Sequence, residues 1–334
     1  MKFLVYIPCH SDFELALVQA RKVRSGFEDF LLNSNYTPLS LQIILSVNAY
    51  TPTSTETKLA ASLFDKVINN GIGYLCELNM MNGYLVALDE KPDLFWILST
   101  NDELVDGAVN NILIEFIKNP SIDLLVTNLY NNEIVIEKQI LDPVKTGTSY
   151  GLISGVIYRL ERIFPYLHNG LFMVWTGWGQ LAVIQSAMDS LNGMSVKYIP
   201  FNLIYTQKER ELHESRRVYA HSIYGLLILC SAFKLSKKEV KKFIITYVFK
   251  NFYRWNFYDR KWNYPGQLVE SKNYLSWNQP IAEALIRKNS ITIYYVYQLF
   301  RIIPFERFHN VSIFVNLKRK FDKMLNQELY YKNK

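Results

Sequence analysis

The sequence predicts an α/β protein with a mostly parallel sheet in its N-terminal part and a mainly helical C-terminal region. Up to about residue 130, short apolar runs alternate with segments of helical spacing. Several of these runs are apolar throughout, which is typical of strands covered by helices on both faces. After residue 215 helical patterns dominate. We therefore expect one domain over residues 1–220 and a helical region over residues 221–334.

The first expected element is a strand at residues 2–7, whose apolar run at residues 4–7 ends at Pro8 and is followed by a helix over residues 13–30. Further strands are expected at residues 41–47, 66–68, 94–98, 124–128 and 196–199, and further helices at residues 57–64, 78–88, 106–117, 180–191, 239–257 and 290–300. Two hairpin-like segments, residues 133–139 and 152–159, interrupt this alternation. They precede an aromatic loop at residues 175–179.

Composition excludes several classes of protein. Apolar residues make up 49% of the 334 residues and charged residues 20%, which is neither a disordered nor a membrane-spanning composition. The longest apolar segment, residues 222–233, is shorter than the roughly 20 residues that cross a bilayer. A strand that starts at residue 2 leaves no room for a signal peptide. The three widely spaced cysteines, Cys9, Cys76 and Cys230, are typical of reduced interior thiols in a cytoplasmic protein.

Charge is divided unequally along the chain. Residues 1–233 hold 17 Lys and Arg against 23 Asp and Glu, a net charge of −6, whereas residues 234–334 hold 20 against 7, a net charge of +13. In the second part, aromatic and basic residues are interleaved at residues 243–257 and 302–321. This pattern indicates contact with an anionic membrane surface. An ordinary core with a solvated basic face is the alternative.

An acidic junction follows one of the expected strands. The apolar run at residues 95–98 stops at Asn101-Asp102-Glu103, three side chains with hard oxygen atoms. Such oxygens suit Mg²⁺ or Mn²⁺, and open α/β sheets bind ligands at the carboxyl ends of their strands. A solvated acidic turn before a helix is the alternative.

Five motifs in order resemble those of family 2 glycosyltransferases with the Rossmann-like GT-A fold, which build bacterial surface polysaccharides. They are Ile7-Pro8-Cys9-His10-Ser11-Asp12, Val47-Asn48-Ala49-Tyr50, Asn70-Gly71-Ile72-Gly73, Asn82 and Asn101-Asp102-Glu103-Leu104. The resemblance covers about residues 3–220. It implies a nucleotide-sugar donor site with a metal, Mg or Mn, at Asp102. The implied donor residues are Pro8, His10, Asp12, Asn48, Asn82, Asn101, Asp102, His213 and Arg216.

Three positions depart from the family pattern. Val47 replaces the Asp that commonly binds the nucleotide base, and Asn101 replaces the first Asp of the metal motif, which indicates weak or dispensable metal binding. The Glu-Asp pair that supplies the catalytic base is missing, and Gln180 lies in its expected neighbourhood. Glutamine cannot remove a proton at neutral pH. The base is then Glu103 or His168, or the chain only binds its ligand.

The expected acceptor site uses Ser154, Trp175 and Trp178. Ser154-Gly155 would let a sugar approach the backbone, although a bulge is equally plausible. Trp175 and Trp178 flank Gly177 and would stack on a sugar ring, although they could also be core aromatics. By resemblance to related transferases, the polar stretch 205–217 would close over the donor and bring His213 and Arg216 to the diphosphate. A solvated helix start with mixed charges is the alternative.

The resemblance therefore implies an inverting hexosyl- or deoxyhexosyltransferase of O-antigen or capsule synthesis. Its partners would be a nucleotide sugar, a lipid-linked oligosaccharide acceptor and the anionic inner-membrane surface, with the protein bound peripherally on the cytoplasmic side. A catalytically silent GT-A-like scaffold is the alternative. A nucleic-acid-binding protein is disfavoured, because no nucleic-acid motif is present and residues 1–233 are acidic.

Overall fold

The computed structural model forms two compact units, Met1–Glu209 and Arg210–Lys334, each described by itself. The structure describes residues 1–9, 13–34, 39–48, 52–70, 76–100, 102–127, 132–141, 150–151, 153–199, 204–206, 224–233, 236, 239–240 and 268–302.

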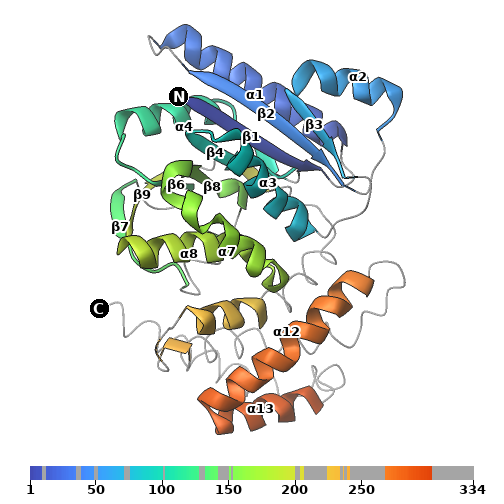
Figure 1. The fold of residues 1–334 in the computed structure, drawn as a ribbon, viewed down its shortest axis with the longest axis vertical. Helices are drawn as coiled ribbons and strands as arrows, with labels where there is room; N and C mark the ends of the chain where they lie inside the picture. Colours follow the sequence, from blue (N-terminus) through green and yellow to red (C-terminus); the bar gives the residue numbers. More distant parts are fainter. Residues whose placement is uncertain are drawn as a thin grey trace, which may run out of the picture. The chain divides into compact units, whose positions relative to one another are not determined.

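An eight-stranded sheet forms the centre of the described N-terminal unit (Figure 1). Its order is β3 (Lys66–Asn69), β2 (Ser40–Val47), β1 (Lys2–Cys9), β4 (Leu94–Ile97), β8 (Val156–Arg159), β6 (Leu124–Thr127), β9 (Met194–Ile199) and β7 (Ile134–Glu137). The first four strands are parallel to one another, β8 is antiparallel to both its neighbours, β6 and β9 are parallel, and β7 is antiparallel to β9. This is the predicted mostly parallel sheet.

Helices cover both faces of this sheet. One group is α1 (Phe13–Asn33), α2 (Ser54–Leu63) and α4 (Ala108–Lys118), and the other is α3 (Cys76–Glu90), α6 (Leu160–Ile163), α7 (Leu167–Phe172) and α8 (Gly179–Leu191). Alternate residues of β1 therefore lie in different environments. Phe3, Val5 and Ile7 join the core under α1 and α4, whereas the ring of Tyr6 contacts Gly83 of α3. Both sides of the strand are buried, as the apolar runs predicted.

The two hairpin-like segments do not pair with each other. Residues 134–137 pair with β9, and residues 156–159 insert between β4 and β6. Each segment forms a single strand whose partners lie far away in the sequence. Between β8 and α8 the chain also forms four short helical elements that the pattern did not predict: α6, α7 and the 3-10 helices η3 (Phe164–Tyr166) and η4 (Val174–Thr176).

A second, two-stranded sheet pairs β5 (Asp102–Leu104) with β10 (Ile204–Thr206) in antiparallel orientation. In the C-terminal unit, residues 224–232 are helical, and α12 (Leu268–Asn289) precedes α13 (Ile291–Ile302). No helix among the described residues is both long enough and apolar enough to cross a bilayer.

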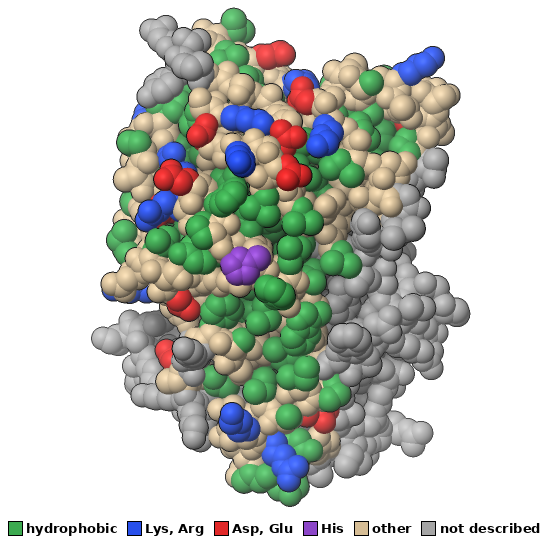
Figure 2. Space-filling model, in the orientation of Figure 1, with side chains coloured by type: hydrophobic (Ala, Val, Ile, Leu, Met, Phe, Trp, Pro, Cys, Tyr) green, Lys and Arg blue, Asp and Glu red, His purple; other side chains and the backbone are tan. Residues whose placement is uncertain are grey.

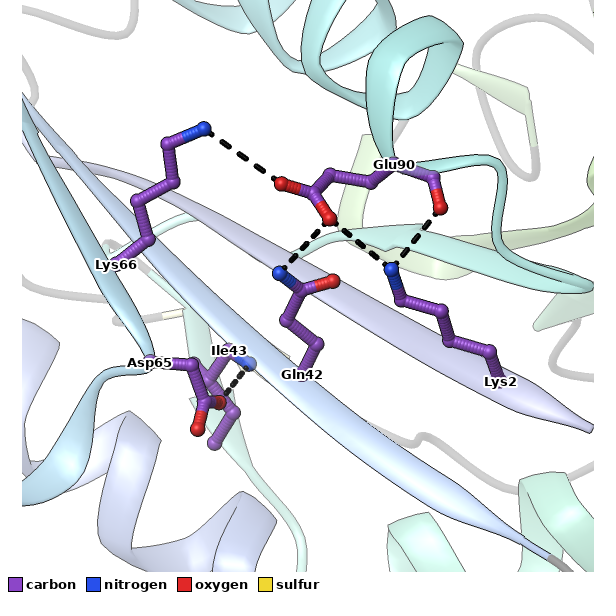
Figure 3. Close-up of polar contacts among 6 residues, drawn as sticks. All are labelled: Lys2, Gln42, Ile43, Asp65, Lys66 and Glu90. Carbon is purple, nitrogen blue, oxygen red and sulfur yellow. Dashed lines mark hydrogen bonds and ion pairs between the residues drawn. The ribbon is translucent and has the colours of Figure 1, made fainter.

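Acidic and basic side chains are interspersed on the described surface of the N-terminal unit in Figure 2. Several of them pair. At the start of β1 and β2, the Glu90 carboxylate accepts hydrogen bonds from Lys2 Nζ and Gln42 Nε2, both at 3.0 Å, and Lys66 lies 3.5 Å away (Figure 3). These bonds lower the pKa of Glu90, with the Lys2 contact as the largest cause. The cluster ties α3 to the amino edge of the sheet, opposite the carboxyl edge where open α/β sheets generally bind ligands.

Candidate active site

The carboxyl ends of β1, β2, β3 and β4 lie at one edge of the sheet because these strands are parallel. Pro8 of β1 and Asn48, directly after β2, lie at this edge. The backbone N–H of Asn48 donates to the Cys9 carbonyl at 2.8 Å. Two of the predicted donor residues are thus brought to the edge where open α/β sheets bind ligands.

A buried polar network lies beneath this edge. The Asn79 side-chain oxygen Oδ1 accepts hydrogen bonds from Ser46 Oγ at 2.7 Å, Tyr6 Oη at 3.2 Å and Asn70 Nδ2 at 3.3 Å. Asn70 Nδ2 also donates to Ser46 Oγ at 3.1 Å. Burial raises the pKa of Tyr6 far above its ordinary value, so the phenol stays neutral. The Asn82 side chain favours a lower pKa of the Tyr6 hydroxyl, but its effect is smaller than that of burial.

Sequence reasoning placed Asn82 at the donor site but missed Asn79, which is the centre of the network. Asn79 and Asn82 are three residues apart on α3 and therefore lie on one side of the helix. The same-face spacing was a usable signal. Asn79 is only 2% exposed, so its side chain supports the edge from below.

Asp102 lies just past β4 and is 5% exposed. Its carboxylate oxygen Oδ2 accepts a hydrogen bond from Ser154 Oγ at 2.6 Å, and its backbone N–H donates to the Ser99 carbonyl at 3.3 Å. Burial raises the pKa of Asp102, and the hydrogen bond from Ser154 counteracts part of this rise. A buried carboxylate with one oxygen already bound presents its other oxygen, Oδ1, as the remaining ligand atom.

Ser154 lies in the 3-10 turn η2 (Ile153–Gly155) before β8, not inside a strand as expected. Its side chain is fully buried and binds Asp102 and the backbone N–H of Ser99. Contact between this side chain and an acceptor sugar therefore stays a prediction. The structure adds a different contact, one that holds the carboxylate.

Glu103 faces away from Asp102. Successive side chains of a strand point to opposite sides, so Asp102 and Leu104 are buried while Glu103 is exposed. Lys22 Nζ of α1 lies 3.1 Å from its carboxylate and also donates to the Leu104 carbonyl. The structure thus separates the two carboxylates that the sequence placed in one motif, and Glu103 is paired with a lysine.

The aromatic segment is a tight turn whose glycines have structural reasons. Gly177 has φ +77°, a left-handed conformation that favours glycine. Gly179 begins α8 where that helix meets α7, and a Cβ there would lie 2.7 Å from the Gly170 carbonyl oxygen and from Met81 Sδ. Trp175 and Trp178 are both partly exposed, which leaves ring surface accessible. Their predicted stacking on a sugar is untested.

The two remaining catalytic candidates differ in exposure. Gln180 is 7% exposed in the first turn of α8, and His168 is exposed on α7 with its ring 6.1 Å from that of Phe172. Within the described part of the chain, no hydrogen bond or ion pair joins His168 to Asp102. The other predicted site residues, His10, Asp12, Asn101, His213 and Arg216, lie outside the described residues.

The β5–β10 pairing places the backbone of Thr206 opposite Asp102. Residues 205–217 were predicted to close over the donor. The start of this polar stretch is therefore adjacent to Asp102, a link between residues more than 100 positions apart that the sequence pattern did not reveal.

In the C-terminal unit, a hollow of about 590 Å³ lies between α12 and α13. It is lined by Pro280, Glu283, Ala284, Arg287, Lys288, Ile291 and Tyr294. The Arg287 guanidinium lies over the Tyr294 ring at 5.9 Å. Ile281, Ile291 and Tyr295 are exposed by 41%, 49% and 64%. Basic and apolar side chains thus share one surface, whereas residues 243–257 and 303–321 lie outside the described residues.

Searches against models of known protein families and against curated sequences find no match. Among solved structures, residues 1–349 of TarS from S. aureus in complex with UDP-GlcNAc superpose with a TM-score of 0.54 at 12% identity, covering 90% of this chain and 88% of that one. The mannosyltransferase PcManGT from Pyrobaculum calidifontis, in complex with GDP-Man and Mn²⁺, gives 0.40 at 9% identity over 98% and 84% of the chains. The TarS match, together with the sheet topology, shows that this chain has the GT-A fold of glycosyltransferases.

Proposed function

We propose that this chain is an inverting glycosyltransferase that moves a hexose or deoxyhexose from a nucleoside diphosphate to a lipid-linked oligosaccharide. The observation that carries the proposal is Asp102, a buried carboxylate held at the ligand-binding edge of a GT-A fold. That TarS binds UDP-GlcNAc supports a nucleotide-sugar donor. Residues 1–220 would hold the donor and catalytic sites, and the product would be O-antigen or capsule.

Asp102 fits a divalent cation such as Mg²⁺ or Mn²⁺. Among the described residues, no group of three or more His, Cys, Asp or Glu gathers in one place. Mg²⁺ commonly binds one or two carboxylates and takes its remaining ligands from substrate phosphates and water, so one carboxylate suffices. When bound, the ion would neutralise negative charge on the leaving diphosphate. His213 and Arg216 would add to this from the stretch that follows Thr206.

The acceptor hydroxyl needs a base as the new bond forms. Glu103 is paired with Lys22, so it would have to leave that ion pair to reach a reacting hydroxyl. His168 is exposed, and its imidazole is the side chain best suited to proton transfer near neutral pH. We therefore favour His168 over Glu103. Trp175 and Trp178 would shape the acceptor site.

The C-terminal unit would contact the cytoplasmic face of the inner membrane. Residues 234–334 have a net charge of +13, and α12 and α13 expose Arg287 and Lys288 beside Ile291. Each basic residue near an anionic leaflet contributes on the order of 1 kcal/mol. A peripheral enzyme of this kind would meet an acceptor whose lipid lies in that leaflet.

The test is a thermal-shift panel of UDP-, GDP-, CDP- and dTDP-sugars, each with and without Mn²⁺, on the wild type and Asp102→Asn. Asn keeps the shape of Asp102 and an acceptor for Ser154. A ligand in excess of its dissociation constant raises the melting temperature by mass action. We expect one nucleotide to give a metal-dependent shift that Asp102→Asn loses. No shift with any donor would contradict the proposal.

The pairing of Glu103 and the glutamine at position 180 favour one alternative, a silent scaffold that binds the nucleotide sugar without transferring it. Slow hydrolysis of the bound donor separates the two. A transferase releases free nucleoside diphosphate over hours even without an acceptor, and Asp102→Asn abolishes this release. A scaffold binds the donor and releases none.

A further inference from the structure

We infer that Ser154 is a positioning residue for the metal-binding carboxylate, fixing which oxygen of Asp102 a cation can use. This inference rests on the proposed role of Asp102. It gives Ser154 a different role from the contact with an acceptor sugar that the sequence indicated. The short connection between β4 and β5 ends at Asp102.

Three hydrogen bonds join Ser154 to β4, to the connection that follows it and to β5. Its carbonyl accepts from Trp96 Nε1 at 2.8 Å, its Oγ accepts from the backbone N–H of Ser99 at 2.9 Å, and the same Oγ donates to Asp102 Oδ2 at 2.6 Å. Trp96 belongs to β4 and is fully buried. Ser154 of η2 therefore ties together β4, the connection after it and the start of β5.

The direction of the last bond follows from proton counting. A serine hydroxyl has a single proton, and Ser99 N–H can only donate, so the Ser154 proton is free to point at Asp102. The distance of 2.6 Å lies in the range of O–H···O⁻ bonds to an ionised carboxylate. Oδ2 is thereby engaged and the rotation of the carboxylate is fixed. A cation at this site would then be bound mainly through Oδ1, because the hydrogen bond leaves Oδ2 with only one lone pair.

This arrangement also bears on the asparagine at position 101. A motif with several carboxylates can hold a metal even when one of them rotates, whereas a site with one carboxylate depends on its orientation. Partners that orient a metal ligand typically change metal affinity by 10–100-fold when removed. Ser154, fully buried and within hydrogen-bond distance of Asp102, is such a partner.

The test measures Mn²⁺ affinity by electron paramagnetic resonance of the free ion, with the full chain and saturating UDP, and separately GDP. We expect Ser154→Ala to weaken Mn²⁺ binding by roughly 10-fold or more. Its affinity for the nucleotide without metal should stay at the wild-type value. Ser186→Ala is the matched control, because Ser186 is 7% exposed and accepts one side-chain hydrogen bond, from Asn169. It should keep wild-type Mn²⁺ affinity.

Ser154→Cys replaces Ser154→Ala if the latter does not fold, because it keeps the approximate size of the side chain and a weak donor. Its Mn²⁺ affinity should lie between that of the wild type and complete loss. Wild-type Mn²⁺ affinity in Ser154→Ala, with Asp102→Asn losing the ion, would overturn this inference alone. Absence of Mn²⁺ binding by the wild type with either nucleotide would overturn both this inference and the proposed metal role of Asp102.

Discussion

The Asn79 network should show strong coupling between Ser46 and Asn79. Asn79→Ala removes the oxygen that accepts from Ser46, Tyr6 and Asn70. Tyr6 keeps the Asn79 carbonyl at 2.9 Å and Asn70 keeps Ser46 Oγ, so the buried Ser46 hydroxyl is the donor that loses its acceptor. An unsatisfied buried donor costs about 1–3 kcal/mol. We expect Asn79→Ala to lower the free energy of unfolding by that amount.

In the Asn79→Ala background, Ser46→Ala should then change the free energy of unfolding little. Ser46→Ala alone removes a hydrogen bond worth about 1 kcal/mol, whereas in the Asn79→Ala background it removes a hydroxyl that is already unsatisfied. It then also removes the last acceptor of Asn70 Nδ2, but Asn70 is partly exposed, so water can replace that bond. The double variant should therefore be no less stable than Asn79→Ala, which gives a coupling energy of about 1 kcal/mol or more.

The assay is urea unfolding of the four proteins, followed by circular dichroism. A control cycle combines Asn79→Ala with Tyr150→Phe. Tyr150 Oη lies 2.9 Å from Tyr198 Oη and shares no hydrogen-bond partner with Asn79, so this pair should be additive. Additivity of Ser46→Ala and Asn79→Ala within about 0.5 kcal/mol would refute the network as described.

Two further predictions concern packing and pH. Gly179→Ala should destabilise the protein by about 1–3 kcal/mol, because the new methyl would meet the Gly170 carbonyl, which belongs to the backbone and cannot rotate away. For a domain of this size the melting temperature should fall by about 2–4 °C per kcal/mol, and an unchanged value would contradict the close packing of α7 and α8. Glu90 has a lowered pKa, so its stabilisation is complete above its unfolded pKa of about 4.3 and is lost as pH falls toward the folded pKa. Glu90→Gln should therefore lower the melting temperature at pH 7. Between pH 5 and pH 3 the variant should lose less of its melting temperature than the wild type. Melting temperatures of the two proteins that fall in parallel would contradict this.

Much of the N-terminal unit could be predicted because its strands are short, apolar and bounded by turn residues. The errors in the predicted helix starts can be explained by the residues at those starts. The α2 helix begins at Ser54 rather than residue 57, since Thr53 and Glu56 form a capping box. The α4 helix begins at Ala108 rather than residue 106, after Gly107 in a left-handed conformation. Pairing partners were harder, because nothing in residues 133–139 or 152–159 specifies a distant strand.

The candidate site shows the same division between what is local and what is distant. Asp102 was predicted from its place after an apolar run, a local signal. The separation of Glu103 from Asp102 would have followed from strand alternation, had residues 102–104 been assigned as a strand. Ser154 is different, since the residue that orients Asp102 is 52 positions away and its contact depends on β8 inserting antiparallel beside β4. A sequence that retains one carboxylate of a metal motif therefore indicates where a metal site is to be expected, while the hydrogen-bond partner of this carboxylate is revealed only by the fold.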